Sequence, residues 1–391
     1  MNRITIHLEA LRHNIGQVHR WMEGHGASWT LVTKVLCGHT DTLKALQTIG
    51  VRCMGDTRLS NLRAIERTVP DLEAWYLRPP SLSDIGEIVR LTDASLNSER
   101  KIIEALDAEA GRQGKTHSIV VMIELGDLRE GILPSSLVEF YDAILHLPNI
   151  RMLGVGANIG CLSGTVPNVD LLTQLVLYRE LLELKFERQL PMISAGSSLL
   201  LPLLLKGQIP KAINHFRIGE AVFLGSNLVN GGTLEGLRAD AIQLEAEVVE
   251  IKEKSLVPVG ETSSVTPFEA ITPEDTAPGQ RGYRAIVAVG QLDTDVTGLT
   301  PINPRFKIAG ASSDLTVVNV GDDTSGLRIG DSISFHVNYA ALVRLMSGPY
   351  IDRVVIPGVE EFTSGFSGES RVDVPPILDS IEPVPSVKRD G

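Results

Sequence analysis

The stretch WTLVTKVLCGHTDTLKALQTIG, residues 29–50, contains the unit from which the fold is built. Its first residues are apolar and β-branched, as in a buried strand, and a single lysine, Lys34, stands before a turn of small residues. Residues 42–49 then place apolar side chains at intervals of three and four, which is typical of an amphipathic helix. Strand followed by helix predicts parallel strand pairing, with Lys34 at the end of its strand.

The same alternation recurs over residues 8–232. Eight strand-like runs stand between segments of helical periodicity: WTLVTK, RCMGD, AWYLRP, ASLNS, SIVVMIEL, MLGVGANI, PMISAG and HFRIGEAVFLG. Eight such units close a (β/α)8 TIM barrel in about 250 residues. A doubly wound open sheet is the alternative, but no glycine-rich fingerprint follows the first strand. The pattern therefore predicts an α/β fold with a (β/α)8 barrel at residues 8–232.

Beyond residue 232 the pattern changes. Strand-like runs, including SISFHVNYAALVRLM at 332–346, follow one another with no long helix between them. They predict a mostly antiparallel β domain over residues 233–365, which residues 1–7 are expected to join. The proline-rich, charged residues 366–391 are expected to form a flexible tail. Two domains also suit a length of 391 residues, which exceeds the usual limit of one core.

The amino-acid composition excludes several classes of binding partner. A formal net charge of −12 argues against nucleic acid or an anionic membrane as the main partner. The N-terminal residues have no apolar signal region, and the longest apolar run, SLLLPLLL, is too short to span a bilayer. Three cysteines, Cys37, Cys53 and Cys161, give neither a disulfide framework nor a paired metal spacing. We expect a cytoplasmic, reduced protein without a metal site.

Polar residues stand where the barrel strands are expected to end. The carboxyl ends of barrel strands meet at one rim, which is where TIM barrels place their functional sites. The residues at these positions are Lys34 after the first strand, Arg129 after the fifth, Asn158 after the sixth, Gly196, Ser197 and Ser198 after the seventh, and Arg217 and Gly219 in the eighth. We therefore expect them at one end of the barrel.

Two of these strand ends resemble an anion site. SAGSS opens a predicted helix, so that backbone amides and two hydroxyls would meet an anion at the positive end of the helix dipole. The alternative is a helix cap formed by Ser197 or Ser198. A second glycine turn, RIGE, follows the neighbouring strand and favours phosphate, which barrels bind at these two loops.

Lys34 is the other half of this interpretation. A lysine at a strand end often extends to water, but one drawn into an apolar barrel mouth loses its charge more easily and becomes nucleophilic. A phosphate site and such a lysine at one rim suggest pyridoxal 5'-phosphate bound covalently through Lys34.

Further along the chain, the segments VTKVLCG, LGDLREG, GVGANIGC, RIGEAVFLG, AEVVEIKEK and GASSDL occur in this order. On these segments the chain resembles the alanine racemase-like family of fold-type III pyridoxal-phosphate enzymes, most closely its ornithine racemase branch. The resemblance covers about residues 3–357.

The resemblance implies a role for each matching residue. Lys34 would bind the cofactor and act as one catalytic base. Arg217 would contact the pyridine nitrogen, which its permanent charge cannot protonate, and this would disfavour side reactions such as transamination. Arg129 would lie near the phenolic oxygen and Asn158 near one face of the ring. The phosphate would be bound by Ser197, Ser198, Gly219, Glu220 and Tyr350, with Gly219 and Glu220 acting through their backbone amides.

Racemisation also needs a second base, on the opposite face of Cα. Alanine racemases use a tyrosine of the partner subunit, but the corresponding residues 257–270 contain none. The candidates are Cys37, Cys161, Ser264, Thr266 and Tyr339. A cysteine is chemically the easiest because a thiol titrates near pH 8.5, and Cys161 is preferred because it stands three residues past Asn158 at the rim.

Asp314, in GASSDL, matches an aspartate that reaches the active site from the partner's β domain, although a turn residue is the simpler interpretation. Asp314 or Glu220 could pair with a distal ammonium of the substrate. The family further implies a homodimer with shared active sites.

The resemblance implies an amino-acid racemase, with ornithine or a similar basic amino acid favoured. An alanine or broad-specificity racemase is one alternative, and a pyridoxal-phosphate homeostasis protein without turnover is another. A related decarboxylase is disfavoured because it would have a carboxylate where Arg217 stands. A metal-dependent aldolase is disfavoured because His336 has no cysteine partner near it in the sequence.

Overall fold

The computed structural model describes residues 2–160, 162, 164–257, 260, 279–365 and 371–381. The chain divides into two compact units. One consists of residues 12–34, 38–237 and 363–391 and contains the barrel, and the other consists of residues 1–11, 35–37 and 238–362 and contains the antiparallel sheet. Residues 35–37, which directly follow Lys34, thus group with the sheet unit although their neighbours on both sides belong to the barrel unit.

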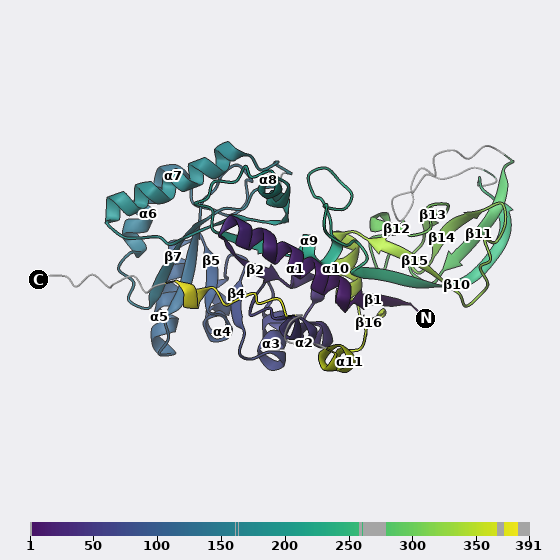
Figure 1. Ribbon diagram of the computed structural model, residues 1–391, viewed down its shortest axis with the longest axis horizontal. Coiled ribbons are helices and arrows are strands. Elements are labelled where there is room, and N and C mark those ends of the chain that lie inside the picture. The colour runs from purple at the N-terminus through teal and green to yellow at the C-terminus, as the bar shows by residue number, and fades with distance from the viewer. Residues whose placement is uncertain are drawn as a thin grey trace, which may run out of the picture. The chain divides into compact units, whose positions relative to one another are not determined.

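The barrel unit is closed by eight parallel strands in chain order, which confirms the predicted fold class (Figure 1). The strands are β2 (Ser28–Val32), β3 (Cys53–Asp56), β4 (Glu73–Tyr76), β5 (Ala94–Asn97), β6 (His117–Met122), β7 (Ile150–Gly156), β8 (Met192–Gly196) and β9 (His215–Ile218). Every residue of β3, β4, β5 and β6 is buried, as expected for strands covered on both faces. Their continuous burial is why these runs read as apolar rather than alternating.

Helices follow the strands around the outside of the barrel (Figure 1). They are α1 (Leu8–His25), α2 (Thr40–Ile49), α3 (Leu59–Thr68), α4 (Ile85–Leu91), α5 (Arg100–Arg112), α6 (Leu137–Ile144), α7 (Val169–Phe186), α8 (Leu201–Leu205) and α9 (Glu220–Leu224). Short 3-10 turns precede several of them: η1 (Lys34–Leu36), η2 (Leu82–Asp84), η3 (Pro134–Ser136) and η4 (Ser198–Leu200). The helix expected from residue 198 is therefore a 3-10 turn followed by five α-helical residues.

The second unit contains a mostly antiparallel sheet, again as predicted. Its strands are β1 (Arg3–His7), β10 (Ile242–Ser255), β11 (Arg281–Val287), β12 (Leu299–Pro301), β13 (Lys307–Ala311), β14 (Thr316–Gly321), β15 (Ser332–Val337) and β16 (Asp352–Ile356). The N-terminal strand β1 pairs with this sheet, antiparallel to β10 and parallel to β16. Helix α10 (Tyr339–Ser347), the turn η5 (Val296–Gly298) and residues 359–362 of helix α11 (Val359–Ser364) also belong to this unit.

The run at 332–346 is only half strand. β15 ends at Val337, and the side chain of Asn338 then accepts a hydrogen bond from the amide of Ala341 at 2.9 Å and caps α10. An asparagine at this position satisfies an amide that the helix leaves without a partner, so the chain changes from strand to helix at one residue. Periodicity missed this change because the apolar residues of both elements are contiguous.

Residues 371–381, expected from composition to be loosely ordered, pack against the strands of the barrel within the same unit. Val374 forms a bridge with Val51, and Ile377, only 1% exposed, enters the barrel core beside Trp75 and Leu96. The turn η7 (Leu378–Ser380) follows, and its first amide donates to the Glu73 carboxylate at 2.8 Å. Residues 371–381 therefore cover the barrel at the amino-terminal ends of its strands.

A buried histidine is expected to make the barrel less stable in acid. His117, at the start of β6, is 1% exposed, and its Nε2 lies 2.8 Å from the Ser95 hydroxyl. Burial lowers the pKa of His117 to about 4. Between about pH 6.5 and pH 4 the unfolded chain binds a proton that the folded chain does not. The free energy of unfolding should therefore fall by roughly 3 kcal/mol as the pH drops through this window.

The contribution of His117 can be isolated by urea unfolding of the wild type and of His117→Gln at pH 7.5 and pH 4.5. The variant should lose clearly less stability on acidification than the wild type, because carboxylates contribute equally to both. An equal loss in the two proteins would contradict the assignment.

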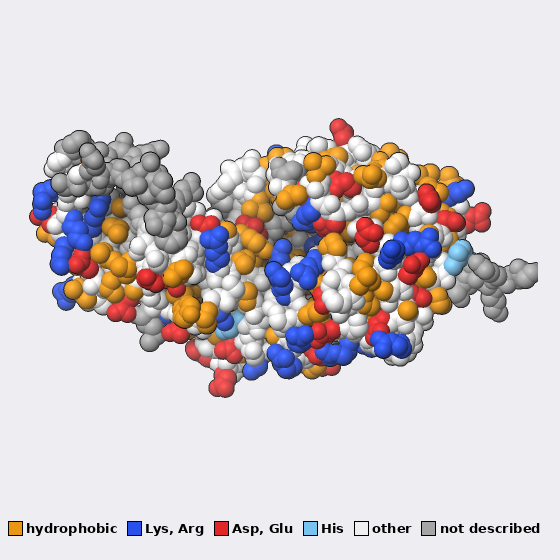
Figure 2. Space-filling model, turned by 180° about the vertical axis from the view of Figure 1, so that it is seen from behind, with side chains coloured by type: hydrophobic (Ala, Val, Ile, Leu, Met, Phe, Trp, Pro, Cys, Tyr) orange, Lys and Arg blue, Asp and Glu red, His pale blue; other side chains and the backbone are white. Residues whose placement is uncertain are grey.

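Acidic and basic side chains are interspersed over the described part of the face seen in Figure 2. Within the described residues, no helix is both long and apolar enough to cross a membrane.

Candidate functional site

The barrel architecture brings the predicted strand-end residues of the barrel unit to one rim. Lys34 lies two residues after β2, Asn158 lies two residues after β7, and Arg217 lies within β9. β2 and β9 are hydrogen-bonded neighbours, with Thr30 opposite Arg217, so the first and last strands meet. Closure of the barrel therefore places the lysine beside a strand that is nearly two hundred residues away in sequence.

Arg217 is the best-anchored of these side chains. It is 7% exposed, and its two terminal nitrogens donate to four acceptors. Nη1 donates to the Ser194 carbonyl at 2.7 Å and to the Ser194 hydroxyl, while Nη2 donates to the Ala157 carbonyl at 3.0 Å and to Asn158 Oδ1 at 2.8 Å. The planar fork of an arginine can make all four bonds at once, which an ammonium cannot. The guanidinium is thus fixed between the ends of β7 and β8.

The hydrogen bonds continue from Asn158 to the loop after β6. The amide nitrogen of Asn158 donates to Glu130 Oε1, and Arg129 donates to the same carboxylate, with Nη2 at 2.7 Å from Oε1. Glu124 holds the loop by accepting from the amides of Leu128 and Arg129, each at 3.1 Å. Three residues predicted from separate strand ends therefore lie in one chain of contacts. The sequence analysis did not identify Glu130, the carboxylate that joins Arg129 to Asn158, because it assigned a role in this loop only to the adjacent Arg129.

His215 and Ser194, two polar residues that the sequence analysis did not identify, lie inside the barrel. His215 Nδ1 lies 2.7 Å from the Ser194 hydroxyl, and Nε2 lies 3.0 Å from Thr30 Oγ1. The ring stacks on Trp75 at 4.9 Å between centroids. Burial, and next the charge of Arg217, hold the pKa of His215 well below its ordinary value, so the ring is neutral at pH 7. His215 thereby orients the hydroxyl that binds Arg217.

The loops after β8 and β9 contact each other directly. The hydroxyl of Ser198 accepts from the amide of Ala221 at 3.2 Å, and the hydroxyl of Ser197 accepts from the amide of Leu199 at 3.3 Å. Ser197 is therefore the cap that the alternative interpretation proposed. A Cβ at Gly219 would lie 2.8 Å from the Val32 carbonyl, so only glycine fits that turn without a shift. Because the helices that begin here are short, hydroxyls and individual amides, rather than a long helix dipole, are the donors available to an anion.

The segment before Lys34 is held in place by a buried carboxylate at the end of the neighbouring strand β3. Asp56, fully buried at the end of β3, accepts from Thr33 Oγ1 at 3.1 Å, and also from the amides of Thr57 and Arg58. Burial raises the pKa of Asp56, and these donors oppose the rise. Lys34 itself is exposed. The exposed Lys34 side chain therefore extends from a backbone segment that is held in place by buried hydrogen bonds.

The other predicted residues are distributed as follows. Cys37, three residues after Lys34, is partly buried in a left-handed backbone conformation with φ 49°, whereas Cys53 is fully buried in β3. Cys161, the preferred second base, lies outside the described residues, as do Ser264 and Thr266. Asp314 and Tyr350 belong to the other compact unit, where both are exposed. Their proposed roles stay predictions.

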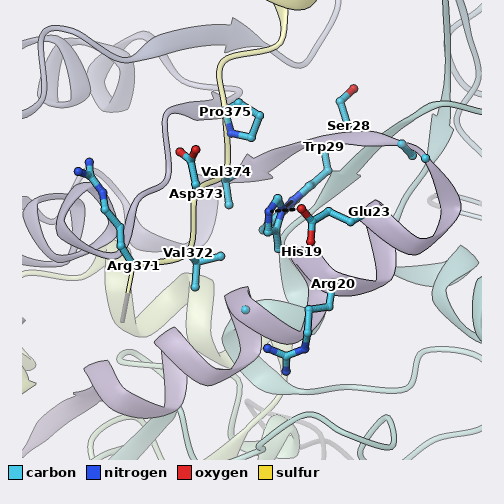
Figure 3. Close-up of a pocket in the computed structure, with 13 residues that line it drawn as sticks. His19, Arg20, Glu23, Ser28, Trp29, Arg371, Val372, Asp373, Val374 and Pro375 are labelled. Atoms are coloured by element: carbon cyan, nitrogen blue, oxygen red, sulfur yellow. Dashed lines mark hydrogen bonds and ion pairs between the residues drawn. The ribbon is translucent and has the colours of Figure 1, made fainter. Parts of the chain in front are cut away.

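A hollow of about 680 Å³ lies at the other end of the barrel strands (Figure 3). Residues of α1, the start of β2 and residues 371–375 line it. Its acidic side chains already have partners, since Glu23 pairs with His19 at 3.5 Å and Asp373 pairs with Arg52. None of the predicted strand-end residues lines it, so we place the candidate site at the opposite rim.

Residues 6–227 match the family described as alanine racemase, N-terminal domain. The chain belongs to the alanine racemase family.

Among particular relatives, the chain is 35% identical over 357 residues to the ornithine racemase of Acetoanaerobium sticklandii, covering 90% of this chain and 99% of that one. It is 30% identical over 359 residues to the lysine racemase of Thermotoga maritima, covering 91% and 99%. The solved alanine racemase from Streptomyces coelicolor A3(2) shares the fold, with a TM-score of 0.68 at 17% identity over 91% of this chain and 98% of that one.

Proposed function

We propose that this protein is a pyridoxal-phosphate-dependent amino-acid racemase that favours ornithine or a similar basic amino acid. The observation that carries the proposal is the arrangement of Lys34 beside β9, whose Arg217 is fixed by four hydrogen bonds at the same rim. The two relatives named for ornithine and lysine support the preference for a basic side chain.

The side chains present fit the cofactor. A primary amine suits its aldehyde, a buried permanent cation suits an acceptor nitrogen, and the hydroxyls and amides of two touching loops suit a phosphate. Bound pyridoxal phosphate would supply the electron sink that makes the proton on the substrate Cα removable. The residues that would hold it are Lys34, Asn158, Ser197, Ser198, Arg217, Gly219, Glu220 and Tyr350.

The chain's own residues would divide the remaining work. Lys34 would remove or return the Cα proton on one face, as its place at the rim allows. Arg217 cannot give up its proton, so it would bind the ring without protonating it. Asn158 and Ser194 hold the guanidinium in place, and Arg129 would bind near the ring through its contact with Glu130. The base on the opposite face is proposed to be Cys161.

We further propose a cytoplasmic homodimer in which the β unit of each chain, with Asp314, completes the barrel site of its partner. A homeostasis protein without turnover is the second candidate. The large second unit, a sheet of eight strands, favours the enzyme, because a pure cofactor carrier needs only the barrel.

A racemisation screen by chiral chromatography tests the function. Loaded protein should interconvert the enantiomers of ornithine or lysine with a kcat/KM at least about tenfold above that for alanine, since a site that pairs a distal charge rejects an analogue lacking it. Serine and arginine complete the set. A kcat/KM for alanine equal to that for ornithine or lysine would indicate the broad-specificity alternative. If none of the five amino acids is racemised, the homeostasis protein without turnover becomes the supported function.

A further inference from the structure

Glu220 is the first residue of α9, directly beyond the end of β9, and Lys34 follows the neighbouring strand β2. In the parallel register of these strands Leu31 lies opposite Ile218, so the segments that follow β2 and β9 leave the barrel side by side. The close approach of Gly219 to the Val32 carbonyl shows how tightly the two strand ends pack. An acid and an amine therefore emerge from adjacent strands at one rim.

The Glu220 carboxyl has no structural partner that explains its burial. Among the described residues, no group donates a hydrogen bond to it, whereas the acid at the end of β3, Asp56, accepts from two amides and two side chains. Burial raises the pKa of Glu220 to about 7, and the charge of Lys34 is the effect that opposes the rise. Two ionisable groups that interact strongly enough titrate as a coupled pair. The adjacent strand ends and the effect of the Lys34 charge on Glu220 are the basis for the proposal that follows.

We propose that Glu220 is a positioning residue that exchanges a proton with Lys34 during racemisation, an inference that rests on the proposed function. An N–H bond of the Lys34 ammonium breaks as an O–H bond forms on Glu220, which leaves a neutral amine and a neutral acid. The reverse transfer restores the ion pair. The net charge of the pair is zero in both states, so the exchange adds no net charge to a desolvated site. Lys34 can thus enter the reaction as either base or acid.

The first test measures the amine without the cofactor. The full-length cofactor-free chain is labelled with acetic anhydride over a series of pH values, and acetylation of Lys34 is quantified by peptide mass spectrometry. In Glu220→Gln the midpoint of Lys34 labelling should fall by about one pH unit, because a neighbouring anion no longer stabilises the ammonium. Glu104→Gln, which removes an exposed acid of α5 paired with Arg100, is the matched control and should leave the midpoint unchanged. An unmoved midpoint in Glu220→Gln overturns the proposal.

The second test uses the loaded enzyme. Glu220→Gln should lower kcat about 10²-fold in both directions at nearly constant KM, and should shift the limb of the kcat–pH profile that lies near pH 7 in the wild type. Glu220→Asp, which keeps an ionisable group, should restore part of kcat and should again show the limb of the kcat–pH profile near pH 7. If instead KM for ornithine rises while kcat is unchanged, Glu220 binds the distal ammonium and the proposal is overturned.

The two tests separate this inference from the proposed function. If the wild type racemises no amino acid but the labelling midpoint still moves, the racemase assignment fails and the pairing of the two residues stands. If the wild type is active and the midpoint does not move, only the proton exchange fails.

Discussion

Replacing Lys34 with alanine is expected to reduce kcat/KM for racemisation by more than ~10³-fold, since the change removes both the covalent attachment and one acid–base group. Stability should change little, within about 0.5 kcal/mol, because the side chain is exposed and the segment before it is held by Asp56 through Thr33. Activity would be followed by chiral chromatography and stability by urea unfolding.

Covalent attachment can be checked independently of activity. After borohydride reduction of the loaded wild type, the cofactor mass should appear on the peptide that carries Lys34, and it should be absent from the variant. Lys44→Ala, at an exposed position on α2, is the control and should behave like the wild type. Retained racemisation in Lys34→Ala would refute the assignment of the lysine.

Replacing Arg217 with methionine should have the second largest effect, and here stability and activity should fall together. The variant leaves the carbonyls of Ser194 and Ala157 and the side-chain oxygen of Asn158 without their donor. Buried acceptors that lose a partner cost about 1–3 kcal/mol each, not additively, so we expect a loss of roughly 3 kcal/mol or more in the free energy of unfolding. Urea unfolding of the cofactor-free protein measures it.

Arg217→Lys separates charge from geometry. The lysine keeps a positive charge but cannot reach four acceptors with one planar fork, so it should recover only part of the stability and little of the activity. If the methionine variant were as stable and as active as the wild type, the arginine would be neither the anchor of this rim nor the residue that binds the ring.

Much of the rim follows from local sequence. The alternation of strand and helix predicts a barrel, and a barrel places the residues after its strands at one end. For this reason the sequence alone predicts that Lys34, Asn158 and Arg217 lie at the same end. Of these three, Asn158 and Arg217 lie in one hydrogen-bonded chain that runs through Glu130 to Arg129. Their chemical roles stay predictions.

The residues that were missed share a cause. His215 and Ser194 lie within buried strands, where a polar residue gives no periodic signal of its own. Their meaning depends on pairing between strands that are adjacent only in the closed barrel. The packing of Ile377 under the barrel likewise depends on a surface that residues 53–96 create, so composition alone indicated a loose tail.

The sequence by itself determined the class of fold and the family and predicted the rim at which the candidate site lies, since period, turn residues and strand ends are properties of neighbouring residues. Only the tertiary structure decided that Arg217 is bound by Ser194 and Asn158, that Glu220 and Lys34 follow neighbouring strands, and that residues 371–381 cover the far end of the barrel. These are contacts between strands and segments far apart in the chain. Such contacts are fixed by barrel closure and by the satisfaction of buried polar groups, which no local pattern encodes.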